Sequence, residues 1–313
     1  LSRHPMSSVL PALGPIFLII LLGALLKRGL MAHLGLANGF WDAAERLTYF
    51  ILFPAMLLTR TATASIGELQ VVPMAAALTA PILLMIGGLL VMRERIPIDT
   101  PGFTSILQGT IRPNIYVALA AAGGLYGAAG NTLVAIAIGV VVPFVNVLCV
   151  VLLTRLIGAG DPGPRTLAKA LASNPIILSV CAGLALNALG IGLPPVIGPT
   201  LDILGRAALP LGLLCVGAGL HFGALKAGRA GIVLATLLKL LGLPLLAALA
   251  CLAFGVEGVT AKVTILFSAA PAASSSYILA RQLGGDHQLM AGILTVQVIA
   301  AAVTLPLIIM ALL

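Results

Sequence analysis

The chain has 313 residues, of which 60% are hydrophobic and 8% are charged, and its mean hydropathy is +1.18. Soluble domains carry about 25% charged residues, so this composition excludes a water-soluble globular protein. The net charge of +8 would suit a nucleic-acid-binding protein, but the sequence has no basic run interleaved with aromatic residues. We therefore predict an all-α, multi-pass protein of the lipid bilayer whose basic residues lie in cytoplasmic loops, with no nucleic acid as partner.

About 20 apolar residues are needed to cross the hydrocarbon core of a bilayer, and the apolar segments predict about ten transmembrane helices. The first of them is interpreted as a helix and not as a signal peptide, because its apolar run exceeds a typical signal core and Lys27-Arg28 follows it directly. In chain order the predicted spans are 9–26, 41–62, 71–92, 103–126, 131–154, 167–190, 196–219, 230–254, 261–281 and 288–312.

Basic residues are distributed unevenly between the two sides that these spans define. The richer side has Lys27, Arg28, Arg46, Arg93, Arg95, Arg155, Arg165, Lys169, Lys226, Arg229 and Arg281, and the poorer side has Arg3, Arg60, Arg206 and Lys262. The positive-inside rule makes the richer side cytoplasmic. Both termini are then predicted on the non-cytoplasmic side of the cell (inner) membrane. A cytoplasmic linker at residues 158–166 divides the chain into two repeats, residues 1–157 and 167–313.

Each of these halves has five predicted spans, so the second half must be inserted upside down relative to the first. Prolines support the repeat, because nearly equal intervals separate Pro54 from Pro210 and Pro113 from Pro271. We predict a 5+5 inverted repeat.

Pro113 and Pro271 interrupt two apolar segments at matching places, ILQGTIRPNIY at 106–116 and ILFSAAPAASS at 265–275. A proline inside a helix removes a backbone donor and clashes with the preceding turn, so the helix breaks. Broken backbone at membrane depth is tolerated where it is buried in protein or lines a wet cavity. Two such breaks in corresponding positions of two repeats predict the binding site of a transporter, formed by two crossing helices.

The chemistry expected at such a crossing is anion binding. Each half-helix after a break begins with unpaired N–H groups and the positive end of its dipole, and two such ends converging on one point suit a carboxylate. Arg112 lies at the first break, and a charge in the middle of a span is costly and usually functional; a compatible alternative is that it caps carbonyls freed by Pro113. The predicted substrate-binding residues are Arg112, Pro113, Asn114, Tyr116, Pro271, Ala272, Ser274 and Ser275.

Lys239 is the other cation in the middle of a span, while all nine acidic residues lie in loops or near span ends. We therefore expect the substrate to supply the negative charge. Coupling to a proton, through Asp202 or Lys239, and exchange for a counter-anion both stay open. Gln108, Asn146 and Gln297 are further second-tier site candidates, although helix-to-helix hydrogen bonding is the commoner role of such residues.

The sequence shows no metal-binding, cofactor-binding or catalytic pattern. Its four cysteines and four histidines have no ligand spacing, and its spans contain no nucleophile–base pair, HExxH motif or phosphate-binding loop. We expect no metal, no cofactor and no enzyme activity.

Three stretches of the chain resemble the auxin efflux carrier family, in particular its bacterial permease branch. They are residues 109–116 with 125–131, residues 174–177 with 207–220, and residues 238–244 with 269–276 and Ala280. The resemblance implies a ten-span inverted repeat in which spans 1, 2, 6 and 7 form a scaffold and spans 3–5 and 8–10 form a transport unit that moves like an elevator. It also implies a homodimer through the scaffold, as in the plant members.

The family includes plant auxin exporters and bacterial permeases proposed for malate and malonate. This chain lacks the long cytoplasmic loop of the plant exporters, and its 4% aromatic content disfavours an aromatic-lined site for indole-acetate. We therefore expect a small mono- or dicarboxylate such as malonate or malate. The alternative is a sodium-coupled symporter of the bile-acid-transporter type. Serines near the breaks would serve it as ligands, but no acidic residue there would.

Overall fold

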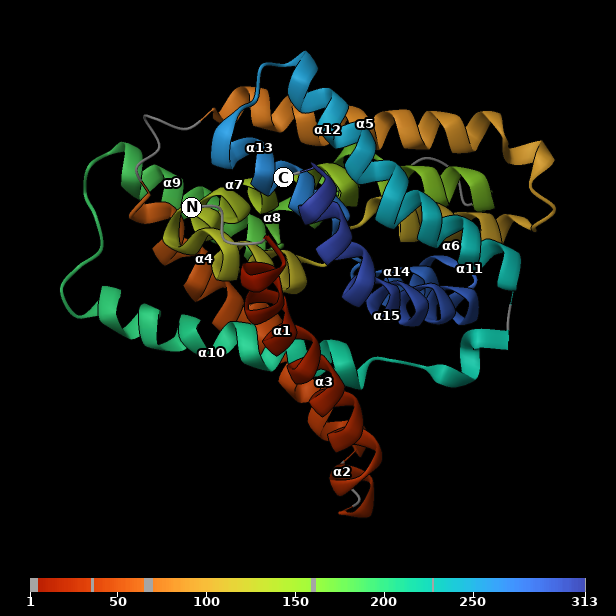
Figure 1. Ribbon diagram of the computed structural model, residues 1–313, viewed down its shortest axis with the longest axis horizontal. Coiled ribbons are helices and arrows are strands. Elements are labelled where there is room, and N and C mark those ends of the chain that lie inside the picture. Colours follow the sequence, from red (N-terminus) through yellow and green to blue (C-terminus); the bar gives the residue numbers. More distant parts are fainter. Residues whose placement is uncertain (1–4, 35–36, 65–69, 159–161, 227, 313) are drawn as a thin grey trace.

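The computed structural model describes residues 5–34, 37–64, 70–158, 162–226 and 228–312, which form helices and no strand (Figure 1). The first half contains α1 (Pro5–Arg28), α2 (Leu30–His33), α3 (Ala37–Leu47), the π-helical turn η1 (Thr48–Leu52), α4 (Phe53–Ala62), α5 (Val71–Val91), η3 (Arg93–Arg95), α6 (Thr100–Ile111) and α7 (Ile115–Ile157). The second half contains α8 (Pro164–Ala172), α9 (Pro175–Ala188), α10 (Ile197–Ala218), η4 (Phe222–Lys226), α11 (Arg229–Leu237), the π-helical turn η5 (Leu238–Gly242), α12 (Leu243–Ala253), α13 (Gly258–Ala269), α14 (Ser275–Leu283) and α15 (His287–Leu312).

Within the described residues, six helical segments are long and apolar enough to cross a membrane. They are Val9–Arg28, Val71–Val91, Ile115–Ile157, Ile197–Ala218, Arg229–Ala253 and His287–Leu312, and the shorter helices α9 and α13 are also apolar. A stack of this many apolar helices defines a multi-pass membrane protein. The arrangement of ten spans as two inverted repeats remains a prediction.

The predicted span 167–190 is wrong as a single helix, because α8 and α9 are separate. Asn174 lies between them, and its side-chain oxygen accepts hydrogen bonds from the backbone N–H groups of Ile176 (3.0 Å) and Ile177 (3.4 Å). Pro175 follows at the first position of α9 and disfavours a helical conformation at Asn174. The chain therefore starts a new helix here.

The boundary predicted between the spans 103–126 and 131–154 is present in the structure. Helix α6 ends at Ile111, and α7 then runs from Ile115 to Ile157 through the turn expected at Tyr126-Gly127. Inside α7 only Gly127 departs from helical geometry (φ 58°, ψ −137°), a conformation open to glycine because it has no Cβ. Gly127 thus separates two helices within α7 at the expected turn, and the second folds back on the first, since a Cβ at Gly130 would meet the carbonyl oxygen of Ala122.

Prolines also shape the helix interiors at η1 and η5. Each π-helical turn ends two residues before a proline, η1 before Pro54 and η5 before Pro244. A proline cannot donate its backbone nitrogen to the preceding turn, and a π turn is one way in which a helix adapts to the lost hydrogen bond. Both predicted spans at these places, 41–62 and 230–254, contain such a turn.

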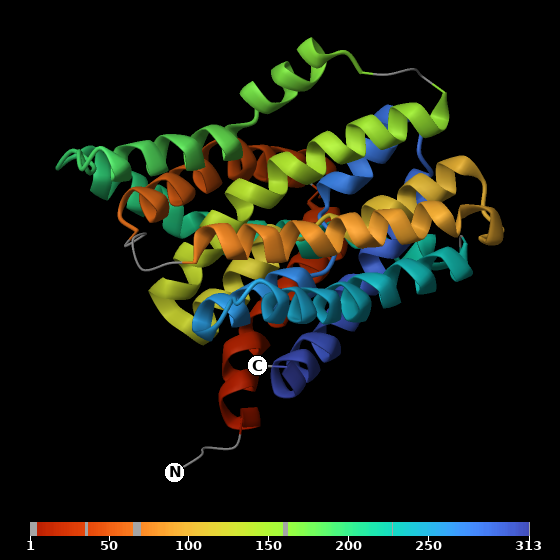
Figure 2. The same cartoon turned by 90° about the horizontal axis from the view of Figure 1, so that it is seen from above.

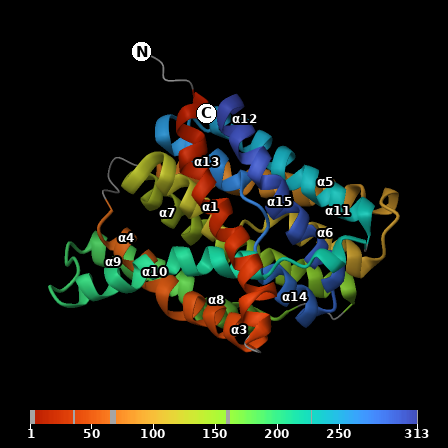
Figure 3. The same cartoon turned by 60° about the horizontal axis from the view of Figure 1, so that its bottom comes forward.

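Helix α1 packs against α10, α10 against α4 and α4 against α9, and α5, α12 and α13 form a second set of neighbours (Figures 1 and 2). The crossing of α1 over α10 (Figure 3) is close because both helices use glycine there. A Cβ at Gly23 would meet the backbone of Leu214, and one at Gly217 would meet the carbonyl oxygen of Ile20. Small residues permit such backbone contact between membrane helices, where packing replaces the hydrophobic effect as the driving force.

Candidate functional site

The interruption between α6 and α7 and the interruption between α13 and α14 meet in the middle of the molecule. Pro113 and Ala272 face each other there as an antiparallel β-bridge. The backbone hydrogen bonds that join the two segments run from Asn114 N to Pro271 O (2.7 Å) and from Ala273 N to Arg112 O (3.1 Å). Segments more than 150 positions apart in the sequence are therefore held side by side.

The Gln297 side chain of α15 connects this bridge to its surroundings. Its amide oxygen accepts a hydrogen bond from the backbone N–H of Ala272 (2.8 Å), and its amide nitrogen donates to the carbonyl oxygens of Gly109 (3.0 Å) and Ala235 (3.1 Å). Gln297 is fully buried. Because it ties one interruption to the end of α6 and to α11, the structure gives Gln297 a positioning role.

Arg112 brings a positive charge to the bridge. Its side chain is 8% exposed, and its Nη2 donates a hydrogen bond to the Ser275 hydroxyl at 3.1 Å. The Nε and Nη1 atoms are buried and have no hydrogen-bond partner among the described residues. Tyr49 of η1 and Cys149 of α7 interact electrostatically with the guanidinium, and the Cys149 side chain is also close enough to hydrogen-bond to it. Buried polar groups are normally paired, so the two open donors are suited to an acceptor that binds from outside.

The two helix N-termini at the bridge differ in what they offer an anion. Asn114 is 2% exposed, and its side-chain oxygen accepts hydrogen bonds from the backbone N–H groups of Tyr116 (3.1 Å) and Val117 (3.2 Å). The first turn of α7 is therefore already capped by its own chain. Helix α14 has no side-chain cap at Ser274, although the backbone N–H groups of Ser276 and Tyr277 donate to Ala273 O (3.0 Å) and Ser274 O (3.1 Å). The buried Ser276 hydroxyl lacks a partner in the described part of the chain. The start of α14, together with Arg112, is the more open side for an anion.

Tyr116 lies where the bridge region meets the helices around α10. Its ring packs edge-on against Phe53 of α4, with 5.0 Å between ring centroids. A Cβ at Gly212 of α10 would lie 2.5 Å from the Tyr116 ring, so the ring fits there because residue 212 is glycine. Glu45 of α3, which is half-buried, interacts electrostatically with Tyr116. Phe53, Gly212 and Glu45 were missed in the sequence because no local pattern links them to residue 116.

The other sequence candidates lie in several environments. Pro271 and Ala272 are buried in the bridge, and Ser274 is half-buried at the start of α14. Gln108 is fully buried, and both of its amide atoms lack partners among the described residues. Asn146 is half-buried on α7.

Asp202 occupies a different place from the other candidates. Its carboxylate pairs with Arg206 one turn further along α10, with 2.6 Å between Oδ2 and Nη2. Ten residues, or about 15 Å of helix, separate Asp202 from Gly212, which contacts Tyr116. The structure does not join Asp202 to the bridge by any contact described here. Within the described residues there is also no group of three His, Cys, Asp or Glu side chains that could hold a metal ion.

Packed apolar helices around two paired interruptions, with a buried cation beside them, are the features of a membrane transport protein. Residues 165–309 match the family model described as "Membrane transport protein", which is the domain of the auxin efflux carrier family. The family predicted from the sequence is thus confirmed for residues 165–309, which carry the auxin efflux carrier domain. The matched family consists of transporters and not of enzymes. Comparison with curated proteins gives no match.

Proposed function

We propose that the protein is a secondary active transporter of small organic anions, mono- or dicarboxylates such as malonate or malate, in the cell inner membrane. The observation that carries this proposal is the buried Arg112 guanidinium, whose Nε and Nη1 have no partner among the described residues. A carboxylate would accept from these donors in a charge-assisted hydrogen bond, which is stronger than a neutral one. Ser275, whose hydroxyl accepts a hydrogen bond from Arg112, is the first residue of α14, so the uncapped start of this helix lies beside the guanidinium.

The proposed substrate site consists of Arg112, Pro113, Asn114 and Tyr116 from the first half and of Pro271, Ala272, Ser274 and Ser275 from the second. In this proposal Arg112 and the start of α14 bind the carboxylate. The two prolines keep the backbone extended, and Asn114 and Gln297 hold the bridge in place. The contacts of Asn114 and Gln297 support this division, since both side chains are engaged in hydrogen bonds with backbone groups.

For the architecture we propose two inverted repeats, residues 1–157 and 167–313, joined by the cytoplasmic linker 158–166, with both termini on the non-cytoplasmic side. The scaffold would comprise α1, α3–α4, α9 and α10, and the transport unit would comprise α5–α7 and α11–α15. The successive packing of α1 on α10, α10 on α4 and α4 on α9 supports the first group. Alternating access would then proceed by elevator-like movement of the transport unit along the scaffold, with Tyr116 at the boundary between the two groups.

A proton or a counter-anion would couple transport to an energy source. Glu45 adds a half-buried carboxylate near Tyr116 to the earlier candidates, Lys239 and Asp202. The homodimer implied by the family resemblance stays a prediction. No observation favours the sodium-coupled bile-acid-type alternative over the anion carrier.

The proposal is tested by uptake of labelled malonate and malate into proteoliposomes, with and without an inward proton gradient. We expect saturable uptake of at least one carboxylate. Stimulation by the gradient would assign proton coupling, whereas gradient-independent uptake that needs internal anion would assign exchange. If folded protein takes up neither these acids nor any other small carboxylate, the proposal is wrong.

A further inference from the structure

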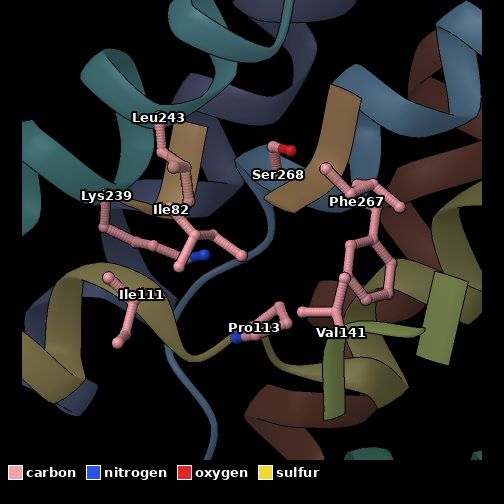
Figure 4. A pocket seen from close by; sticks show the side chains of 9 residues that line it. Ile82, Ile111, Pro113, Val141, Lys239, Leu243, Phe267 and Ser268 are labelled. Atoms are coloured by element: carbon pink, nitrogen blue, oxygen red, sulfur yellow. The ribbon is translucent and has the colours of Figure 1, made fainter. Parts of the chain in front are cut away.

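Lys239 is a buried charged residue that the anion site does not use. It lies in η5 and is fully buried, and its Nζ has no hydrogen-bond partner among the described residues. The side chain extends into a small cavity of about 10 Å³, which Ile111, Pro113 and Ser268 also line (Figure 4). A cavity of this size holds about one water molecule. A buried ammonium without a partner is very costly, and a source of negative potential beside it would offset that cost.

Carboxylates do not supply that potential, because every other side chain lining the cavity is uncharged. The backbone does. Ile111 is the last residue of α6, and Phe267 and Ser268 belong to the last turn of α13. The last four carbonyl groups of a helix lack intrahelical partners and carry the negative end of its dipole. The cavity therefore lies at the C-terminal ends of both interrupted helices.

Some of these carbonyl oxygens are already occupied. Gln108 O accepts from Arg112 N, Gly109 O accepts from Gln297, and Phe267 O accepts from Ala270 N. The residues that follow them, Thr110 and Ile111 in α6 and Ser268 and Ala269 in α13, carry the last carbonyl groups of the two helices, and Ile111 and Ser268 line the cavity. In transporters with interrupted helices, such carbonyl ends coordinate a monovalent cation. The helix C-terminal ends thus create a negative potential on the side of the bridge where Lys239 lies, whereas the side with Arg112 is positive.

We propose that the Lys239 ammonium fills a monovalent-cation site formed by the C-terminal ends of α6 and α13. It is held there through the single water molecule that the cavity admits. The fold thereby carries its own fixed cation at the crossing, and this site needs no sodium. The π-helical turn places Lys239 at this point, just before Pro244, and π turns are frequent at functional sites. This inference concerns the resting structure and holds for any substrate.

The test uses the full chain, purified without substrate, and compares its Tm in sodium chloride and in choline chloride of equal concentration. The wild type should have the same Tm in both salts, because its cation is covalently attached. In choline, Lys239→Ala should have a Tm several degrees below that of the wild type, because the carbonyl ends lose their cation and a space remains. Added Na⁺ or NH₄⁺ should raise this Tm with increasing concentration, because an ion that binds the native state stabilises it.

Two further variants separate charge from volume and position. Lys239→Met fills the space without a charge, so its Tm should be low and unresponsive to Na⁺. Lys169→Ala removes an exposed lysine of α8 and should leave the Tm and its salt response unchanged. If Lys239→Ala does not yield folded protein, Lys239→Gln takes its place in the same comparison.

The proposal is overturned if Lys239→Met is as stable as the wild type. It is also overturned if the Tm of the smaller variant is the same in Na⁺, NH₄⁺ and choline, or if the wild type itself gains stability from Na⁺. Since no substrate is present, these results are independent of whether the protein takes up carboxylates.

Discussion

At the residue scale, the two buried cations of the crossing have different surroundings. Arg112 has a hydroxyl partner in Ser275 and two open donors beside an uncapped helix start. Lys239 lies at the C-terminal ends of two helices and has no side-chain acceptor in its cavity. Backbone dipoles account for this difference, since helix starts attract anions and helix ends attract cations. Substitutions at the two positions should therefore affect different properties, substrate uptake at Arg112 and cation-dependent stability at Lys239.

Arg112→Ala should abolish carboxylate uptake while leaving the protein folded. Each hydrogen bond to a charged group contributes about 1.5–3 kcal/mol, so the loss of two should reduce uptake at low substrate concentration by at least about a hundredfold. Arg112→Lys keeps the charge without the planar pair of donors and should retain part of the activity. Initial uptake rates in proteoliposomes measure the effect, with Arg206→Ala, an exposed arginine of α10, as control. Near-wild-type uptake by Arg112→Ala would rule out the anion site.

Gln297→Leu should destabilise the protein through the bridge. The substitution leaves the N–H of Ala272 and the carbonyls of Gly109 and Ala235 without their side-chain partner, and each buried unpaired group costs about 1–3 kcal/mol. We expect a clearly lower Tm in a thermal unfolding experiment. Gln288→Leu, at an exposed position of the same helix, is the matched control. An unchanged Tm for Gln297→Leu would show that these hydrogen bonds are not needed.

At the element scale, prolines decide where the helices of the crossing end. Asn114 N and Pro271 O are joined by a hydrogen bond that a continuous helix would not form. Pro54 and Pro244 lie inside helical segments and are accommodated by π turns, whereas residues 112–114 and 270–274 lie outside any helix. A proline can thus lie inside a helical segment or at an interruption. The interruptions at the crossing are distinguished by the contacts between the two extended segments.

Pro113→Ala and Pro271→Ala should each slow transport. Alanine restores a backbone donor and removes the clash with the preceding turn, so it favours a continuous helix over the extended segment. Initial uptake rates, normalised to the amount of reconstituted protein, test this. Pro306→Ala, in the interior of α15, controls for the general effect of removing a proline from a membrane helix. Wild-type rates in both crossing variants would show that the interruptions do not serve transport.

At the scale of the whole molecule, the proposed transport unit must move relative to the proposed scaffold. Helices α1 and α7 pack against each other across this boundary. A Cβ at Gly124 of α7 would lie 3.5 Å from the Cβ of Ala12 of α1, which is within the Cβ–Cβ distance range of a disulfide, about 3.5–4.5 Å. This pair can therefore link the two groups of helices with a small local shift, because the Gly124 Cβ would also lie 3.2 Å from the Ala12 carbonyl oxygen.

We expect that Ala12→Cys combined with Gly124→Cys stops uptake when oxidised and regains it on reduction. The native cysteines Cys149, Cys181, Cys215 and Cys251, which are all unpaired, are first replaced by alanine so that the engineered pair is the only one. The two single-cysteine variants serve as controls, since neither can form the link. Full uptake by the oxidised protein would contradict a movement between α1 and α7.

The sequence by itself determined that this is a multi-pass helical membrane protein with the auxin efflux carrier domain. Its apolar composition leaves too few charged residues to cover a water-facing surface, and the motifs that identify the family are local in the chain. Arg112 and Lys239 were also recognisable from the sequence, because a charge within an apolar run is conspicuous wherever the run folds. The Asn174-Pro175 pair, which begins a new helix, is also visible in the local sequence, but the predicted span 167–190 ran through it.

The tertiary structure decided what each of these groups contacts. The sequence indicated two similar helix starts at the crossing. In the structure, the Asn114 side chain caps the start of α7, whereas no side chain caps the start of α14. The position of Lys239 at two helix ends, and the hydrogen bonds of Gln297 to three separate segments, depend on residues far apart in the chain. Composition and periodicity report on single segments. The partners of a buried polar group are set by how those segments pack, and that information is present only in the folded molecule.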